Sequence, residues 1–314
     1  MKTILVFLEH DENGVSDLSL QALALARGLG GTVEALVTGE GLEAHARTAL
    51  EHGATQAWTV EHAALRTYLA GPTARAVAQV VKERGAGLVL FPSSTVGNDL
   101  APLVAGLLDA ACLVECDGVE PAGDTWRLRR TEFDAQARAV YEPLGGGPVL
   151  VTLKDGVAEA APAPAGGGTA ALAADPGPAA SQVLRREVVK KTVNLKDARV
   201  IVGGGAGVGS KEAFTQLELL AAKLGGEIGA TRASVDAGWV SAERQIGQTG
   251  VTVRPDLYIA VGISGAVQHL VGIREAKTVV SINSDPSAPI FRVSHYRVVG
   301  DLNAVVPKLI ELLG

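Results

Sequence analysis

The chain has 314 residues, of which 47% are hydrophobic and 20% are charged, a balance typical of globular proteins and compatible with two domains. The formal net charge of −6 and the lack of any long lysine or arginine cluster argue against a dedicated nucleic-acid-binding protein. No uncharged apolar run reaches the roughly 18 residues that a membrane-spanning helix requires, so we expect no membrane insertion.

The N-terminus has the pattern of a core strand rather than of a signal peptide. Residues 4–8 are apolar, but acidic residues follow at once in HDEN, residues 10–13, and there is no small-residue cleavage site. We therefore expect a cytoplasmic protein.

Cysteines and histidines give no sign of a metal site. Cys112 and Cys116 are expected to lie on one face of a strand as two buried thiols, too far apart to bridge. The six histidines lack the spacing of metal ligands. We predict no metal.

Apolar strands alternate with helices over the first 110 residues. We expect strands at residues 2–8, 32–37, 56–60 and 87–91, and helices at residues 18–29, 42–51, 73–84 and 100–108. Such alternation predicts a parallel sheet with helices on both faces.

Strands without helices follow from residue 111 to residue 153, separated by Gly, Pro and Asp turns. The run from residue 128 to residue 142 alternates charged and apolar side chains, which predicts antiparallel strands added to the first domain. Residues 156–182 are rich in Ala, Gly and Pro and are interpreted as a linker. The segment that follows is expected to add a last strand, and we expect the first domain to end near Glu187, giving domains of residues 1–187 and 188–314.

The second domain begins with a strand at residues 198–202 and a glycine-rich turn, GGGAGVGS, residues 203–210. This turn is only loosely similar to the dinucleotide-binding fingerprint, because the third glycine is missing. Glycines between a strand and a helix still allow backbone amides to approach a diphosphate.

The stretch from Pro255 to Pro289 carries the most information about function. Residues 259–261 end an apolar strand, Gly262 and Gly265 follow in a turn, and a second strand covers residues 277–282. A right-handed crossover places both strand ends at one edge of a parallel sheet, which is where open α/β sheets bind ligands.

Four segments resemble the signature of the alpha subunit of electron transfer flavoprotein. They are LYIAVGISGAVQHLVGI at residues 257–273, SINSDPSAPIF at residues 281–291, TRASVDAGW at residues 231–239, and RQIGQTG at residues 244–250. The close resemblance covers residues 200–313, whereas the first half matches only in layout. It implies a doubly wound, Rossmann-like, FAD-binding domain behind an N-terminal parallel-sheet α/β domain.

The resemblance also implies which residues act on the cofactor. Arg232 would lie over the flavin, His269 near its C2 carbonyl and Thr249 near N5. Cations and donors there would tune the flavin, because its reduction adds negative charge to the N1 and C2 carbonyl edge. The residues that would hold the cofactor are Thr231, Ile246, Gly247, Gln248, Ser264, Gly265, Ala266, Val267, Gln268, Asn283, Asp301 and Leu302. Ala206 stands where the family usually has an arginine.

By the same resemblance the chain is an electron carrier rather than an enzyme. It would pair with the electron transfer flavoprotein beta subunit as a heterodimer, accept electrons from acyl-CoA and other flavin dehydrogenases of fatty acid beta-oxidation, and pass them to a membrane quinone oxidoreductase. The alternative is an NAD-dependent oxidoreductase on a Rossmann-like sheet. That function needs an acidic residue at the end of the second strand, whereas Glu227 is expected at the start of its strand.

Overall fold

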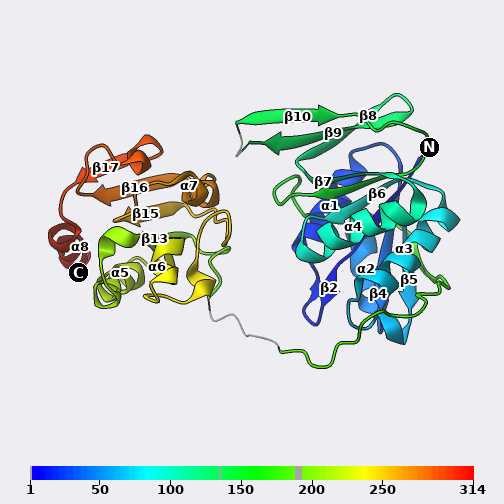
Figure 1. The fold of residues 1–314 in the computed structure, drawn as a ribbon, viewed down its shortest axis with the longest axis horizontal. Helices are drawn as coiled ribbons and strands as arrows, with labels where there is room; N and C mark the ends of the chain where they lie inside the picture. Colours follow the sequence, from blue (N-terminus) through cyan, green and yellow to red (C-terminus); the bar gives the residue numbers. More distant parts are fainter. Residues whose placement is uncertain (1, 134–135, 188–192) are drawn as a thin grey trace. The chain divides into compact units, whose positions relative to one another are not determined.

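The computed structural model describes residues 2–133, 136–187 and 193–314. The chain divides into two compact units, Met1–Arg186 and Glu187–Gly314, whose helices and strands are labelled in Figure 1. Each unit has hydrophobic cores of its own.

The N-terminal unit is built on a seven-stranded sheet in the order β12-β5-β4-β1-β6-β11-β7, with every neighbouring pair parallel. The strands are β1 (Thr3–Phe7), β4 (Thr32–Gly39), β5 (Gln56–Glu61), β6 (Ala86–Pro92), β7 (Ala111–Cys116), β11 (Val149–Leu153) and β12 (Gly168–Ala171). A short ribbon of β2 (His10–Asp11) and β3 (Gly14–Val15) follows β1. The predicted parallel sheet is confirmed.

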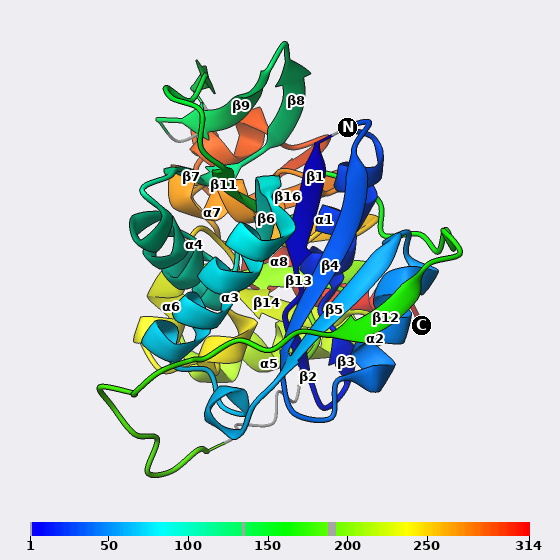
Figure 2. The ribbon, with the colours of Figure 1, turned by 90° about the vertical axis from the view of Figure 1, so that its right-hand side faces the viewer.

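Helices cover both faces of this sheet, as the alternation predicts. One core contains side chains of α1 (Asp17–Arg27) and α2 (Glu43–Glu51), and the other contains side chains of α3 (Ala70–Arg84) and α4 (Thr95–Leu108); Figure 2 shows the two pairs on opposite sides of the sheet. The helix expected from residue 100 begins five residues earlier because the Ser94 hydroxyl accepts a hydrogen bond from the Gly97 amide, 2.9 Å away, and caps it. A 3-10 turn, η1 (Ala63–Leu65), precedes α3.

A separate antiparallel sheet, in the order β10-β9-β8, is formed by β8 (Gly118–Ala122), β9 (Thr125–Glu132) and β10 (Ala137–Tyr141). The alternating charged and apolar run therefore does form antiparallel strands. The strands on either side of it, β7 and β11, join the parallel sheet instead.

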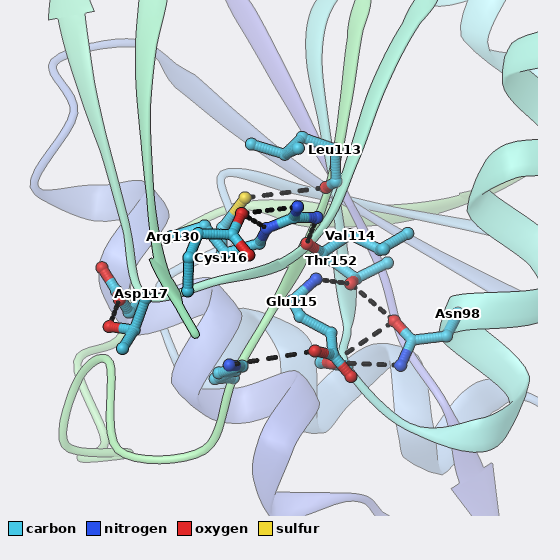
Figure 3. A network of polar contacts seen from close by, with 12 residues as sticks. Asn98, Leu113, Val114, Glu115, Cys116, Asp117, Arg130 and Thr152 are labelled. Atoms are coloured by element: carbon cyan, nitrogen blue, oxygen red, sulfur yellow. Dashed lines mark hydrogen bonds and ion pairs between the residues drawn. The ribbon is translucent and has the colours of Figure 1, made fainter. Parts of the chain in front are cut away.

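The two cysteines lie on opposite faces of the parallel sheet, so the expectation of a shared face is wrong. Cys116 is buried in the core with α1 and α2, whereas Cys112 is half-buried and packs against the other core. Between them Glu115 has a φ of 59°, and its amide donates to Thr152 Oγ1 at 2.7 Å (Figure 3). This bulge adds one residue to the strand and reverses the faces that follow.

The predicted linker is partly ordered on the sheet. Within residues 156–182, β12 pairs with the edge strand β5, although it consists of Gly, Thr and Ala, because strand pairing needs only backbone groups. Downstream, Arg75 donates from Nε to the Pro176 carbonyl and from Nη2 to the Pro178 carbonyl, both at 2.6 Å. Residues 183–187 form no strand, and the rest of the possible last strand, residues 188–192, lies outside the described residues.

The C-terminal unit contains a five-stranded parallel sheet in the order β14-β13-β15-β16-β17. The strands are β13 (Val200–Gly204), β14 (Glu227–Ala230), β15 (Leu257–Val261), β16 (Thr278–Asn283) and β17 (Tyr296–Val299), with helices α5 (Lys211–Lys223), α6 (Arg232–Asp236), α7 (Val267–Ile273) and α8 (Leu302–Leu312). Short 3-10 turns are η2 (Ala206–Val208), η3 (Ala242–Arg244) and η4 (Pro289–Arg292). Because β14 lies on one side of β13 and the later strands on the other, the strand order reverses between β13 and β15, as in doubly wound sheets.

Across residues 2–133, 136–187 and 193–314, no helix has both the length and the apolar character needed to cross a membrane. The same residues contain no group of three or more His, Cys, Asp or Glu side chains placed to hold a metal ion.

Candidate cofactor site

A cavity of about 660 Å³ opens at the carboxyl ends of the strands in the C-terminal unit. Gly205 follows β13, Thr231 follows β14, Gly262 follows β15, and Asn283 ends β16, and all four line it. The cavity therefore lies at the point where the strand order reverses, the usual ligand site of such sheets.

Glycines bring two turns of the cavity wall into direct backbone contact. The Gly207 amide donates to the Gly262 carbonyl at 2.9 Å, and a Cβ added to Gly205 or Gly207 would collide with the Gly262 backbone. Gly262 itself has a φ of +61°, a conformation that glycine adopts at low cost. The glycines of GGGAGVGS thus let this turn pack directly on the turn that follows β15, and Ala206 contributes only a methyl group to the lining.

The segment Gln245–Val251 is joined to α7 by a backbone hydrogen bond, and two glycines leave space for the close approach. The Gln248 amide donates to the Gln268 carbonyl at 2.8 Å. A side chain on Gly247, whose φ is +137°, would lie against that carbonyl, and one on Gly272 would strike the Gly247 amide. The wall formed by this segment is therefore already set in position.

The Thr249 hydroxyl already accepts a hydrogen bond within the protein. Gln245 Nε2 donates to Thr249 Oγ1 at 2.9 Å, and an amide N–H can only donate. The hydroxyl hydrogen of Thr249 is consequently available to an acceptor within the cavity.

His269 is a buried, neutral base in the cavity wall. Its ring, with 6% of the residue exposed, places Nδ1 3.1 Å from the Ile246 carbonyl and Nε2 3.0 Å from the Tyr258 hydroxyl. Burial lowers the pKa of His269 to about 4, and the Ile246 carbonyl opposes this shift only in part. A carbonyl only accepts, so Nδ1 carries the hydrogen and Nε2 accepts from Tyr258.

Arg232 is the cation at the mouth of the cavity. It begins α6, its side chain is 69% exposed, and its Nε lies 3.3 Å from Asp236 Oδ2 one turn later. Exposed ion pairs of this kind contribute little, so the guanidinium can leave Asp236 for a stronger anion.

The remaining predicted residues fall into two groups. Lining the cavity are Thr231, Ile246, Gly247, Gln248, Ser264, Ala266, Gln268 and Asn283, together with the three tuning residues Arg232, Thr249 and His269. Gly265, Val267, Asp301 and Leu302 are not part of its lining. Asp301 instead caps α8 by accepting from the Asn303 amide at 2.9 Å, and Val267 is exposed.

Several lining residues were not singled out from the sequence. Gln245, Asp285 and Pro289 belong to them, and all three lie within or beside the segments that carry the family resemblance. Their position in those segments was the available signal.

Glu227 is the first residue of β14, at the opposite end of the strand from Thr231 and the cavity. An NAD-dependent oxidoreductase would need an acidic residue at the carboxyl end. The geometry gives this alternative no support.

Comparison with known proteins agrees with the site. The electron transfer flavoprotein domain matches residues 4–180, and the electron transfer flavoprotein FAD-binding domain matches residues 194–274, which identifies FAD as the cofactor. The electron transfer flavoprotein subunit alpha of Pseudomonas aeruginosa is 37% identical, over 98% of this chain and 98% of that protein. Those of Thermoanaerobacterium thermosaccharolyticum and Bacillus subtilis are each 34% identical, over 99% of this chain and 97% of the relative. The chain belongs to the electron transfer flavoprotein alpha subunit family.

Proposed function

We propose that this chain is a cytoplasmic electron carrier that works as a heterodimer with an electron transfer flavoprotein beta subunit. It receives electrons from acyl-CoA and other flavin dehydrogenases and delivers them to a membrane quinone oxidoreductase. The observation that carries the proposal is the cavity at the sheet's switch point, within the matched FAD-binding domain. Its volume of about 660 Å³ falls in the range of roughly 300–1,000 Å³ found for cofactor sites.

The lining fits FAD in chemistry as well as in size. Gly205, Gly207 and Gly262 let two turns at the strand ends pack backbone against backbone at the cavity, and glycines in such turns let backbone amides approach a diphosphate. Thr231, Ser264, Gln268 and Asn283 add polar groups, and Ile246, Gly247, Gln248 and Ala266 complete the wall. Gly265 and Val267 would shape the same turn, whereas Asp301 and Leu302 would meet the adenosine end.

Bound FAD supplies one- and two-electron redox chemistry, in which reduction adds negative charge to the flavin. Arg232 would place its guanidinium toward that charge. Thr249 would donate its free hydroxyl hydrogen. His269 would gain a proton at Nε2 when negative charge arrives, because a nearby anion raises a histidine pKa, and the Tyr258 hydroxyl would then turn from donor to acceptor.

The test is a stepwise anaerobic reduction of the FAD-loaded chain, purified with its beta subunit, in wild-type and Arg232→Ala forms. A hydrogen bond to a charged group contributes roughly 1.5–3 kcal/mol. If Arg232 makes it only to the reduced cofactor, its loss lowers the one-electron potential by about 60–130 mV.

Arg232→Lys is the matched control, since it keeps the charge without the planar fork and is expected to lose less. An unchanged potential in Arg232→Ala, with FAD still bound, would refute the role of this residue. A complex that takes up no FAD at all would refute the proposed function.

A further inference from the structure

Tyr258 is the largest fully buried side chain among the residues that the structure describes, and its hydroxyl group contacts His269 in the cavity wall. It lies on β15, and its oxygen is 3.0 Å from His269 Nε2. A buried phenol requires a hydrogen-bond partner, and in the part of the chain that the structure describes the recorded partner is His269. The remainder of the ring packs among Ile201, Ile246 and Ile273 in the core.

The neighbouring strand is shaped to admit this hydroxyl. Gly203 on β13 lies beside β15, and a Cβ at this position would collide with the Tyr258 hydroxyl. Gly203 thus leaves space for a polar atom inside an otherwise apolar layer. In this space the Tyr258 hydroxyl forms its hydrogen bond with Nε2 of the His269 ring.

Two hydrogen bonds determine which tautomer the neutral His269 ring adopts. The Ile246 carbonyl, 3.1 Å from Nδ1, accepts only, so the hydrogen of the neutral ring is on Nδ1. Nε2 then accepts from Tyr258, whose hydroxyl can both donate and accept.

We propose that Tyr258 is a positioning residue for His269. The Tyr258 hydroxyl holds the orientation of the imidazole ring and so keeps the Nδ1 hydrogen bonded to the Ile246 carbonyl. The ring in turn ties the segment Gln245–Val251 to α7. This inference rests on the proposed role of His269 beside the cofactor. Tyr258 thus has a function in the site although it is buried in a core strand and does not line the cavity.

The direct test is the side-chain nitrogen NMR spectrum of the histidines in the full-length chain loaded with FAD, with His269→Asn used to assign the His269 signals. Tyr258→Phe removes only the hydroxyl. In this variant the Nε2 signal is expected to move toward the chemical shift of an unprotonated imidazole nitrogen that accepts no hydrogen bond. Tyr296→Phe, a change at an exposed tyrosine of the same unit, is the matched control. An unmoved Nε2 signal in Tyr258→Phe overturns the proposal.

A double-mutant cycle on the reduction potential adds a functional readout. Asn at position 269 can keep a donor near Nδ1 but has no atom at Nε2. Tyr258→Phe is expected to change the one-electron equilibrium constant about two- to tenfold in the wild-type background, a fall in potential of up to about 60 mV, and to cause no further fall in His269→Asn.

Equal shifts in the two backgrounds overturn the proposal, because Tyr258 would then act independently of His269. If His269→Asn alone leaves the potential unchanged, the tuning role of His269 fails, and the nitrogen spectrum decides the positioning role of Tyr258. Gly203→Ala, which displaces the hydroxyl without removing it, is expected to reproduce the shift of the Nε2 signal.

Discussion

His269 is a base that the folded chain keeps neutral. Burial lowers its pKa to about 4, against about 6.5 in an unfolded chain. Between these values the unfolded state binds more protons, so stability is fully present above about pH 6.5 and falls as the pH drops toward 4. Because each pH unit is linked to about 1.4 kcal/mol, we expect the C-terminal unit to lose about 3 kcal/mol over this window through His269 alone.

This loss can be measured by denaturant unfolding at pH values from 7 to 4.5 with a reporter inside the unit. Trp239 lies in the C-terminal unit, whereas Trp58 and Trp126 lie in the N-terminal unit. Replacing the latter two with Phe leaves one fluorescent probe. His269→Asn in that background is expected to flatten the pH dependence, and parallel curves for the two proteins would contradict the assignment to His269.

At the residue scale, the segments that carry the family resemblance include many residues of the cavity lining, but they did not indicate the contacts within it. The segments with Gly247, Gln248 and Gln268 do meet at the cavity, because matched segments carry their spatial relations with them. The bond from Tyr258 to His269 was not predicted, since Tyr258 in LYIAV has the pattern of an ordinary core residue. Contacts of single polar atoms depend on tertiary packing that local periodicity does not encode.

At the scale of elements, period and composition predicted the alternating strands and helices of the first 110 residues but neither the bulge in β7 nor the edge strand β12. The bulge at Glu115 depends on a hydrogen bond from its amide to the distant Thr152 side chain, and the local sequence ACLVEC contains no signal for it. The edge strand β12 lacks large side chains and so has no hydrophobic signal. In both cases backbone hydrogen bonding decides the local structure.

The segment after β12 is held by the side chains of α3. Arg75 binds the carbonyls of Pro176 and Pro178, and Gln79 binds the Asp175 backbone. Removing a charged donor costs roughly 1.5–3 kcal/mol per bond, so Arg75→Ala is expected to increase amide hydrogen exchange of β12 and of Leu172 by about tenfold or more. Lys82→Ala, at an exposed position of the same helix, is the control. Equal exchange in both variants would mean that β12 is held by strand pairing alone.

At the scale of the whole molecule, the two units are separately cored. Among the described residues, each hydrophobic cluster draws its members from one unit only. The cavity lining runs from Gly205 to Pro289 and lies wholly within the second unit. Alternating strands and helices, read together with the family resemblance, were enough to predict this doubly wound sheet, because strand order follows from crossover handedness and short connections.

A unit with its own core and its own site is expected to fold and bind FAD by itself. We therefore predict that residues 187–314, expressed alone, unfold cooperatively and take up FAD, although more weakly than the complete chain with its beta subunit. Circular dichroism and quenching of FAD fluorescence measure the two properties. The same fragment with Arg232→Ala changes only an exposed side chain, so it should fold equally well and bind more weakly. A fragment that stays unfolded would show that the second core depends on the N-terminal unit, and a folded fragment without FAD affinity would show that the cavity needs groups from outside it.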